Sequence, residues 1–384
     1  MSSPPTFALV AGEPSGDLLG ADLISGLVNS HPGARLVGIG GPGMRAAGME
    51  TWWDSNELAH FGLFEVLTHL PRLLSIRRKL FRRLRELRPD VFIGIDAPDF
   101  NLGLETQLKS AGIRTIHYVS PTVWAWRKGR VRKIARAADK VLCLFPFEPA
   151  FYQAHGVEAA YVGHPLARRI PLYNDATEAR RQIGIDSARQ VVALLPGSRA
   201  SEVSRLSGPL IEAAQLLSRS MPSLQFISAM ANPAVGELFR AAMRQSAGPD
   251  ITLVDGQSRT VMAAADVVVC ASGTATLETM LVNRPLVSVY RLAPATYHLA
   301  RLTRLLRRQF FALPNILAKQ ALVPELIQDE VTAENVARET RRWLQDQSAR
   351  QALSARFDAL HSEMIGEAVQ SAASVVSNVL PGST

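Results

Sequence analysis

Two loops in the second half of the chain have the residue types of a phosphate-binding site. The longer one follows the apolar run 267–270 and leads into a stretch with helical spacing. Small residues there let a ligand approach the backbone, and the unpaired N–H groups at a helix start attract a diphosphate, with an acidic side chain in reach of ribose hydroxyls. An ordinary capped helix start is the alternative interpretation. The residues concerned are Ser272, Gly273, Thr274, Ala275, Thr276 and Glu278.

The second loop contains Gly197, Ser198 and Arg199 and also follows an apolar run directly. The guanidinium of Arg199 can make a charge-assisted, two-pronged contact to a phosphate oxygen that leaves with negative charge. A surface salt bridge is the alternative for this arginine taken alone. Two such loops in one half of the chain favour a nucleotide diphosphate as the ligand.

A carboxylate that can act as a base ends the apolar run Val91–Ile95. Asp96 at that place can accept the proton of an attacking sugar hydroxyl. Capping of the next helix by Asp96 or Asp99 is the alternative, and Glu13 is the second candidate base. The two aspartates lack the further ligands that a metal site needs, so we expect no metal and no cofactor.

The loop after the first apolar run carries Glu13, Ser15 and Asp17 and suits sugar hydroxyls better than phosphate. A turn with a helix cap explains Ser15 and Asp17 equally well.

The run Gly38–Gly43 spells G-x-G-x-x-G, but it follows the second apolar run and contains a proline, so it is a weak dinucleotide site. His117 lies on a candidate strand, where a core histidine is favoured over a residue of the ligand site.

These loops need a parallel sheet to position them, and short β-branched runs alternate with helical stretches along most of the chain. A polar, proline-containing stretch near residues 165–173 separates two such series. We therefore expect an α/β protein with two Rossmann-like, doubly wound domains, 1–168 and 169–345. Ligands bind outside the carboxyl ends of such strands, so a cleft between the two domains is expected to hold both substrates. The strands are expected at 7–11, 36–39, 91–95, 115–119, 140–144, 191–195, 224–230, 251–254, 267–270 and 286–290.

Basic and apolar residues are combined in two segments, 58–88 and 297–311. Leu73, Ile76, Leu80, Leu84 and Leu87 keep helical spacing beneath eight basic residues, as in a helix that lies on anionic lipid. A packing helix with a solvated outer face is the alternative for each segment.

The net charge of +8 also fits nucleic acid, but no recognised nucleic-acid module occurs. No signal peptide or membrane-spanning run is evident, and the buried-looking Cys143 and Cys270 indicate a reducing cytoplasm.

The same motifs occur together, in this order, in the family of bacterial lipid A disaccharide synthases, which the chain resembles over nearly its whole length. The matching stretches are 9–17 (LVAGEPSGD), 94–100 (GIDAPDF), 117–126 (HYVSPTVWAW), 194–199 (LLPGSR), 271–278 (ASGTATLE) and 313–318 (LPNILA). The resemblance implies a GT-B-type fold and an inverting transfer of 2,3-diacylglucosamine from UDP-2,3-diacylglucosamine to 2,3-diacylglucosamine 1-phosphate (lipid X). By the same resemblance Asp96 is the essential carboxylate and Arg199 the essential arginine.

The resemblance further assigns Trp124, Trp126 and Asn315 to the acceptor or cleft side, where Ser15, Asp17 and Asp99 are also expected. It implies a peripheral place on the cytoplasmic face of the inner membrane, and a C-terminal helix, 346–384, that returns to the first domain or to that of a partner in a homodimer. Three rivals remain. They are another GT-B-like UDP-sugar enzyme (a 2-epimerase or a peptidoglycan glycosyltransferase), a non-catalytic membrane-binding protein, and, weakest, a nicotinamide oxidoreductase.

Overall fold

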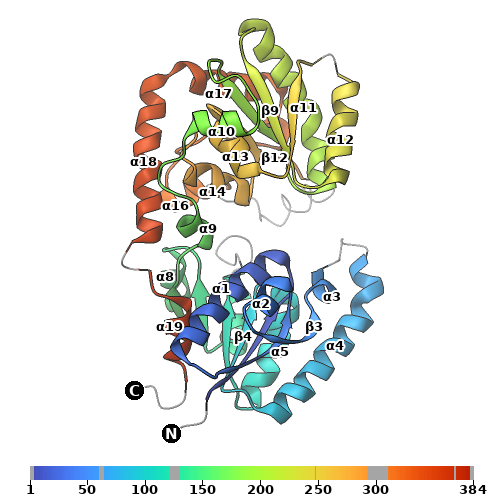
Figure 1. Ribbon diagram of the computed structural model, residues 1–384, viewed down its shortest axis with the longest axis vertical. Coiled ribbons are helices and arrows are strands. Elements are labelled where there is room, and N and C mark those ends of the chain that lie inside the picture. Colours follow the sequence, from blue (N-terminus) through green and yellow to red (C-terminus); the bar gives the residue numbers. More distant parts are fainter. Residues whose placement is uncertain are drawn as a thin grey trace. The chain divides into compact units, whose positions relative to one another are not determined.

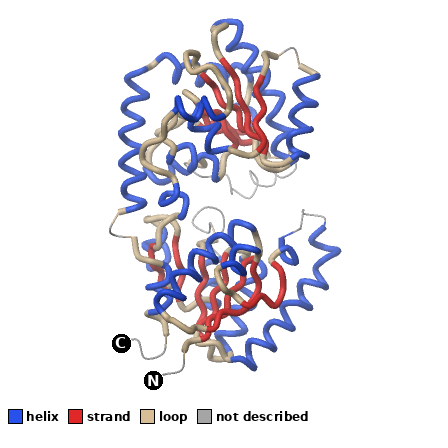
Figure 2. Tube along the Cα trace, in the orientation of Figure 1, coloured by secondary structure: helices blue, strands red, loops and turns tan. Residues whose placement is uncertain are grey.

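The computed structural model describes residues 4–59, 65–121, 130–246, 248–292, 310–366 and 369–380. The chain divides into two compact units. Unit 1 comprises Met1–Pro165 with Gly366–Thr384, and unit 2 comprises Leu166–Ile365. In each unit the strands form one parallel sheet that helices flank (Figure 2). The predicted α/β class with two Rossmann-like domains is confirmed.

The sheet of unit 1 has seven strands in the order β3-β2-β1-β4-β5-β6-β7. Every neighbouring pair is parallel. The strand order reverses between β1 and β4, which makes the carboxyl ends of these two strands the place where a doubly wound sheet binds ligands. The strands are β1 (Thr6–Ala11), β2 (Arg35–Gly40), β3 (Glu50–Asp54), β4 (Val91–Ile95), β5 (Arg114–Tyr118), β6 (Lys140–Cys143) and β7 (Glu158–Tyr161).

Helices connect these strands, and one of them comes from the far end of the sequence. The C-terminal helix α19 packs against α1 in unit 1 (Figure 1). A hydrogen bond of 2.7 Å between His31 Nε2 and Ser377 Oγ joins the end of α1 to α19. The helices are α1 (Pro14–Ser30), α2 (Pro42–Ala46), α3 (Asn56–Ala59), α4 (Glu65–Leu87), α5 (Pro98–Ser110), α7 (Arg130–Ala137), α8 (Glu148–Gln153) and α19 (Ala372–Ser377); α9 (Pro165–Arg169) spans the division between the units.

The sheet of unit 2 has the order β10-β9-β8-β11-β12-β13 and is parallel throughout. Its order reverses between β8 and β11. The strands are β8 (Val191–Leu195), β9 (Gln225–Met230), β10 (Ile251–Asp255), β11 (Val267–Ala271), β12 (Leu286–Tyr290) and β13 (Glu325–Ile327). The helices are α10 (Ala176–Gln182), α11 (Ala200–Ser220), α12 (Pro233–Arg244), α13 (Ser258–Ala264), α14 (Thr274–Leu281), α16 (Leu313–Ala318), α17 (Ala333–Gln345) and α18 (Gln347–Ile365), with a 3₁₀ turn at Gln328–Glu330.

The ten predicted strands are all present, and three further strands, β3, β7 and β13, were missed. All three lie at the edge of a sheet, and their residues are mostly half-buried, so they lack the continuous apolar run of a central parallel strand. The C-terminal segment predicted as one returning helix is two helices in the structure. α18 packs on unit 2, and only the chain from Gly366 onward belongs to unit 1.

The basic helix α4 uses its apolar stripe inside unit 1. Ile76, Leu80 and Leu84 are buried in one core cluster with residues of β1, β2 and β4. Burial of a side chain of this size contributes about 1.5–3 kcal/mol, so this stripe stabilises the fold and is not available to lipid. The prediction that these leucines and Ile76 form a lipid-facing side is wrong for the buried three. Most basic side chains of α4, among them Arg78, Lys79, Arg82 and Arg85, remain exposed.

Candidate functional site

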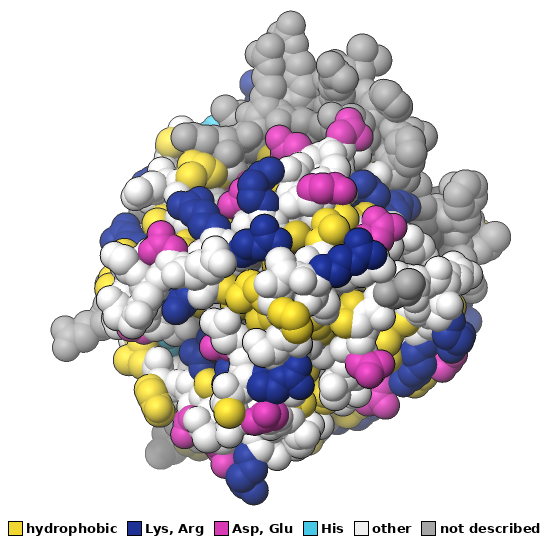
Figure 3. Space-filling view, turned by 90° about the horizontal axis from the view of Figure 1, so that it is seen from above, with side chains coloured by type: hydrophobic (Ala, Val, Ile, Leu, Met, Phe, Trp, Pro, Cys, Tyr) yellow, Lys and Arg dark blue, Asp and Glu magenta, His cyan; other side chains and the backbone are white. Residues whose placement is uncertain are grey.

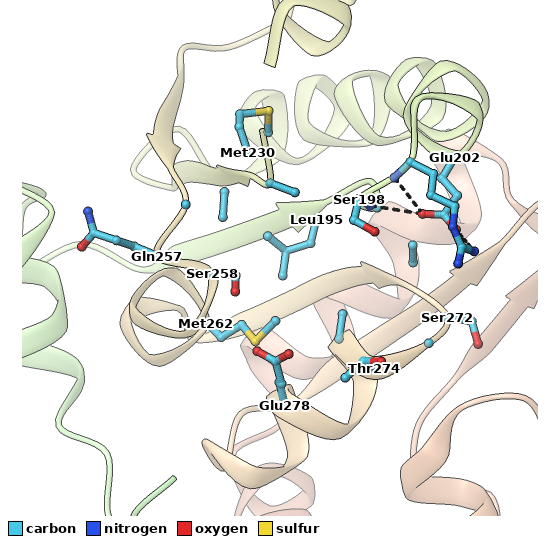
Figure 4. Close-up of a pocket in the computed structure, with 18 residues that line it drawn as sticks. Leu195, Ser198, Glu202, Met230, Gln257, Ser258, Met262, Ser272, Thr274 and Glu278 are labelled. Carbon is cyan, nitrogen blue, oxygen red and sulfur yellow. Dashed lines mark hydrogen bonds and ion pairs between the residues drawn. The ribbon is translucent and has the colours of Figure 1, made fainter. Parts of the chain in front are cut away.

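The two predicted phosphate loops lie together at the carboxyl edge of the unit 2 sheet. They line one pocket of about 500 Å³ at the point where the strand order reverses (Figure 4). Gly197, Ser198 and Arg199 follow β8, and Ser272, Gly273, Thr274 and Ala275 lead into α14. Because β8 and β11 are neighbours, residues more than 70 positions apart in the sequence reach the same pocket.

The loop after β8 is held open by Glu202 in the first turn of α11. Its carboxylate accepts hydrogen bonds from the backbone N–H of Ser198 (3.1 Å) and of Arg199 (3.3 Å) (Figure 4). Gly197 has a φ of +118°, and a Cβ at this position would stand 2.4 Å from Glu202 Oε2. Only glycine therefore fits here. The Arg199 guanidinium is largely exposed and lies 3.5 Å from Glu202 Oε1, so it is able to turn toward a ligand.

The start of α14 offers backbone N–H groups to the pocket. Gly273 has a φ of +150°, and a Cβ at this position would meet no atom within 4 Å, so the backbone is open to a ligand at this point. Unpaired N–H groups in the first turn of a helix attract negative charge. Glu278, one turn further on, is half-buried in the pocket wall. Burial raises the pKa of its carboxyl, and the nearby Arg259 opposes that rise.

Thr276 is the one predicted donor-side residue that does not line the pocket. Its side chain is fully buried, and its hydroxyl donates to Gly273 O (2.7 Å) and accepts from the Leu313 N–H (3.2 Å). Its backbone N–H also donates to Gly273 O (3.1 Å). Thr276 therefore shapes the helix start and has no free group for a nucleotide.

Several lining residues were not among the predicted site residues, and three of them are Gln257, Ser258 and Met262 (Figure 4). They come from α13 and from the turn before it, after β10. Gln257 has a φ of +48°, which places it in the left-handed region. The signal that was available is a polar turn, Asp255-Gly256-Gln257-Ser258, directly after an apolar strand.

In unit 1, Asp96 and Glu13 follow β4 and β1, the two strands at the reversal of strand order. Asp96 is half-buried and has a φ of +51°, in the left-handed region that aspartate and asparagine tolerate best. Its N–H donates to Tyr118 O (2.9 Å), and its carbonyl accepts from Asn101 Nδ2 (2.8 Å). The turn that carries the carboxylate is therefore fixed from two sides.

The electrostatic surroundings of Asp96 combine burial with one nearby histidine. Burial raises the pKa of the Asp96 carboxyl above its usual range, while the charge of His117 and the N–H of Ala97 oppose that rise. His117 itself is fully buried on β5, and its Nδ1 lies 2.7 Å from Glu105 Oε1. The burial of His117 agrees with its interpretation as a core residue.

Asp17 is a structural residue and does not reach a sugar. It is buried, and its carboxylate accepts three hydrogen bonds from the N–H groups of Gly41 (2.7 Å), Gly43 (2.8 Å) and Met44 (3.0 Å). The prediction of Asp17 as a ligand residue is wrong, and its alternative, a helix cap, is right, although the helix capped is α2. The G-x-G-x-x-G run is thereby occupied by the protein's own carboxylate, so it is no dinucleotide site.

We expect Asp17→Ala to lower the free energy of unfolding by about 2–4 kcal/mol, because three N–H groups, two of them in buried and one in a partly buried hydrogen bond, lose their acceptor. Denaturant unfolding measures this change. The UDP dissociation constant is expected to stay within twofold, since the donor pocket lies in unit 2. A stability equal to that of the unchanged protein would contradict the structural role.

The side chain of Asn315 is also used in hydrogen bonds within the fold. It is buried in α16; its Nδ2 donates to Val323 O and Glu325 Oε1, and its Oδ1 accepts from the N–H groups of Leu322 and Val323. Both lone pairs and both amide hydrogens are therefore used. Glu325 in turn accepts from the Phe311 and Ala312 N–H groups, so this network holds the loop that contacts Ser272 and Thr276.

The remaining predicted residues are placed as follows. Ser15 and Asp99 are exposed in the first turns of α1 and α5, and Glu13 is exposed at the start of α1. Trp124 and Trp126 lie outside the described residues, as does most of the basic segment 297–311. The two phenylalanines at the end of that segment, Phe310 and Phe311, are half-buried, and Phe311 stacks on Tyr290. Cys143 and Cys270 are buried free thiols, as expected.

Solved structures with similar folds are glycosyltransferases and UDP-sugar enzymes. The glycosyltransferase of kitacinnamycin gives a TM-score of 0.62 at 16% identity, covering 99% of this chain and 100% of that chain. A UDP-GlcNAc 2-epimerase from Neisseria meningitidis bound to UDP-GlcNAc also gives 0.62, at 10% identity, covering 94% and 97%. At these identities the likeness shows the fold alone, which is the GT-B arrangement of two Rossmann-like domains.

Sequence relatives are far more similar. Lipid-A-disaccharide synthase of Xanthomonas campestris pv. campestris (strain 8004) is 49% identical over 378 residues, 98% of this chain and 86% of the relative. The protein of the same name from Alcanivorax borkumensis is 46% identical over 376 residues, 98% of each chain. The family model described as lipid-A-disaccharide synthetase matches residues 7–376. With motifs, fold and full-length similarity in agreement, this chain belongs to the lipid-A-disaccharide synthetase family, whose members are glycosyltransferases.

Proposed function

We propose that this protein transfers 2,3-diacylglucosamine from UDP-2,3-diacylglucosamine to the 6-hydroxyl of lipid X. The products are UDP and a β(1→6)-linked tetra-acyl disaccharide 1-phosphate. The observation that carries the donor side is the pocket of unit 2, where a basic side chain, a helix start and a half-buried carboxylate line one space of nucleotide size. Family membership over nearly the whole chain supports the reaction and disfavours an epimerase or a non-catalytic protein.

On the donor side, the diphosphate lies against the start of α14, with the Arg199 guanidinium on the oxygen that becomes the leaving group. Preorganised donors aimed at developing negative charge are among the strongest contributions to catalysis. Glu278 is placed to accept hydrogen bonds from ribose hydroxyls. This arrangement supplies the charge that a divalent metal supplies in other transferases.

On the acceptor side, Asp96 acts as general base in a single displacement. The proton of the 6-hydroxyl passes to the Asp96 carboxylate while its oxygen forms a bond to the anomeric carbon of the donor. The bond from that carbon to the diphosphate oxygen breaks, and its electron pair leaves with UDP. Attack from the face opposite UDP inverts the anomeric carbon. Glu13, after the neighbouring strand β1, is the second candidate base.

Two measurements test this function. UDP at 100 times its dissociation constant should stabilise the folded protein by about 2.7 kcal/mol, seen as a rise in Tm, because a ligand that binds only the folded state stabilises it. Incubation with UDP-2,3-diacylglucosamine and lipid X should release UDP and form the disaccharide. If UDP does not raise the Tm, the assignment of the unit 2 pocket as the donor site is wrong. If UDP is released but no disaccharide forms, the assignment of lipid X as the acceptor is wrong.

We also propose that the enzyme acts at the cytoplasmic face of the inner membrane, held there by charge. The outer side of α4 carries Arg78, Lys79, Arg82 and Arg85, all exposed. On the face drawn in Figure 3, by contrast, basic and acidic side chains are interspersed. No helix within the described ranges is long and apolar enough to cross a bilayer. Attraction of clustered basic residues to anionic lipid contributes about 1 kcal/mol per residue near the surface.

The triple variant Arg78→Gln, Lys79→Gln, Arg82→Gln is expected to bind vesicles containing anionic lipid about 100-fold more weakly, as three such charges are removed. Co-sedimentation with phosphatidylglycerol vesicles measures this. The matched control changes three exposed arginines of unit 2, Arg181, Arg219 and Arg338, to glutamine and should bind as before. Equal loss in both triple variants would mean that net charge, and not α4, drives binding.

A further inference from the structure

One buried amide side chain holds the turn that carries the candidate base. Asn101, at the end of the first turn of α5, is fully buried. Its Nδ2 donates to Asp96 O (2.8 Å), Ile95 O (3.3 Å) and Val10 O (3.3 Å). Val10 belongs to β1 and Ile95 to β4, the two strands at the reversal of strand order. A single side chain therefore ties together the carboxyl ends of both strands that lead to the candidate bases.

The surroundings of this side chain require an N–H donor. Nδ2 faces three carbonyl oxygens, which accept hydrogen bonds and donate none, so an oxygen in its place would be repelled. Asn101 Oδ1 is buried and makes no hydrogen bond with a described residue. Buried polar atoms in native proteins are nearly always paired, so this unpaired oxygen indicates that the fold retains the amide for its N–H groups. Neither an apolar side chain nor a carboxylate supplies the same contacts.

The turn that Asn101 holds has a strained backbone. Asp96 and Ala97 have φ angles of +51° and +42°, so two consecutive residues with a Cβ lie in the left-handed region. This region is unfavourable for residues other than glycine and persists only where surrounding contacts enforce it. The Asp96 N–H donates to Tyr118 O (2.9 Å), and the Asp96 carbonyl accepts from Asn101. Because both peptide groups of Asp96 are held, the direction of its Cα–Cβ bond is fixed.

Two glycines make room for this arrangement. A Cβ on Gly94 of β4 would stand 3.0 Å from Asn101 Cβ, and a Cβ on Gly12 would stand 2.8 Å from Ala97 Cβ. A larger residue at position 94 would press on the amide, and a larger residue at position 12 would press on the turn. The strand before the turn and the loop after β1 are therefore both shaped to fit Asn101 and Ala97.

We propose that Asn101 is a positioning residue for the transfer, because its amide holds the left-handed turn that aims the Asp96 carboxylate at the acceptor hydroxyl. The inference rests on the proposed function, with Asp96 as the base. Asn101 is buried and touches neither substrate. Without its amide the turn relaxes toward ordinary backbone angles, the Cα–Cβ bond of Asp96 changes direction, and the carboxylate moves away from the proton that it accepts.

A double-mutant cycle tests this role. Asn101→Ala is expected to lower kcat about 10- to 100-fold, because misplacement of a catalytic group by about 1 Å costs up to about 100-fold. In an Asp96→Asn enzyme the same change should lower the residual kcat by less than about twofold, since the effects of residues that act as a unit are not additive. UDP affinity should be unchanged in both backgrounds, because the donor pocket is built by unit 2.

A rescue and a matched control separate positioning from stability. Glycine adopts left-handed backbone without a steric penalty, so adding Ala97→Gly to Asn101→Ala should recover kcat about fivefold. The control is Thr115→Val near the amino end of β5. Thr115 is also fully buried, and its hydroxyl donates to Ala137 O (2.8 Å) and Asp139 Oδ2 (3.2 Å). Its loss should lower the free energy of unfolding but leave kcat unchanged.

A folded Asn101→Ala enzyme with unchanged kcat overturns the proposal, and so does an equal loss of kcat in the Asp96→Asn background. If Asn101→Ala does not fold, Asn101→Ser takes its place, because a serine hydroxyl can bond back to Ala97 O within the helix but is too short to reach Asp96 O. The same loss and the same non-additivity are then expected. Full turnover in Asp96→Asn alone would instead remove the base assignment, and this single variant shows that failure without reference to Asn101.

Discussion

Asp96→Asn is expected to lower kcat about 100- to 10,000-fold, the usual contribution of a positioned general base. Asparagine keeps the shape of aspartate and tolerates the left-handed backbone at φ +51°, which alanine would strain. The loss is therefore one of chemistry and not of folding. UDP affinity, measured by calorimetry, should stay within about twofold, because the donor pocket is built by unit 2.

A control and a pH profile sharpen this result. Glu158→Gln removes an exposed carboxylate of unit 1 that pairs with Lys140 at 3.3 Å, and it should leave kcat unchanged. In the unchanged enzyme, kcat/KM should fall as pH drops through the pKa of Asp96, since only the carboxylate accepts the proton. Because burial raises that pKa, the fall should begin above the range of an ordinary aspartate. If Asp96→Asn abolishes UDP binding instead, the residue does not act as the base.

Arg199→Met is expected to lower kcat about 100- to 1,000-fold. In other enzymes, removal of one preorganised hydrogen-bond donor that faces a developing negative charge has an effect of this size. Methionine retains much of the length of the side chain but removes the guanidinium. The effect on UDP affinity should be smaller than that on kcat, since the contact strengthens as the diphosphate leaves. Steady-state kinetics with the isolated enzyme separates the two parameters.

The matched control is Arg181→Met, which removes an arginine paired with an acid three residues away, as Arg199 is, but outside the pocket. It should leave kcat unchanged. If Arg199 and the helix start carry the charge of the leaving group, turnover should also persist in a chelator. Complete loss in the chelator, restored by magnesium, would contradict this account of leaving-group stabilisation.

Local patterns were enough for the fold and for the donor loops. Nine of the ten predicted apolar runs became central strands, because a strand buried on both faces must be apolar along its length, and the tenth became the edge strand β10. The loops at Gly197–Arg199 and Ser272–Ala275 were predicted to share a ligand, and they line one pocket because β8 and β11 are neighbours. The edge strands β3, β7 and β13 escaped notice because their short, half-buried sequences contain no continuous apolar run.

For residues that allowed more than one interpretation, contacts with residues distant in the sequence decided between the interpretations. Asp17 suited a sugar as well as a helix cap until α1 and the start of α2 were brought together. Asn315 matched a functional position, yet every hydrogen-bonding group of its side chain is used by the loop before β13 and by Glu325 at the start of β13. The apolar stripe of α4 was compatible with contact to lipid and with packing in a core. In the structure its residues Ile76, Leu80 and Leu84 are buried against the sheet, so it belongs to the core.

The sequence by itself therefore determined the two-domain α/β class, ten of the strands and the chemistry available at the strand ends, because these follow from apolar periodicity and residue type over short spans. Tertiary structure alone decided which polar groups meet. Glu105 and His117 show no pattern that links them, and Gly94 looks like an ordinary strand glycine. Only the parallel register of β4 and β5, with α5 packed beside them, brings a carboxylate onto an imidazole.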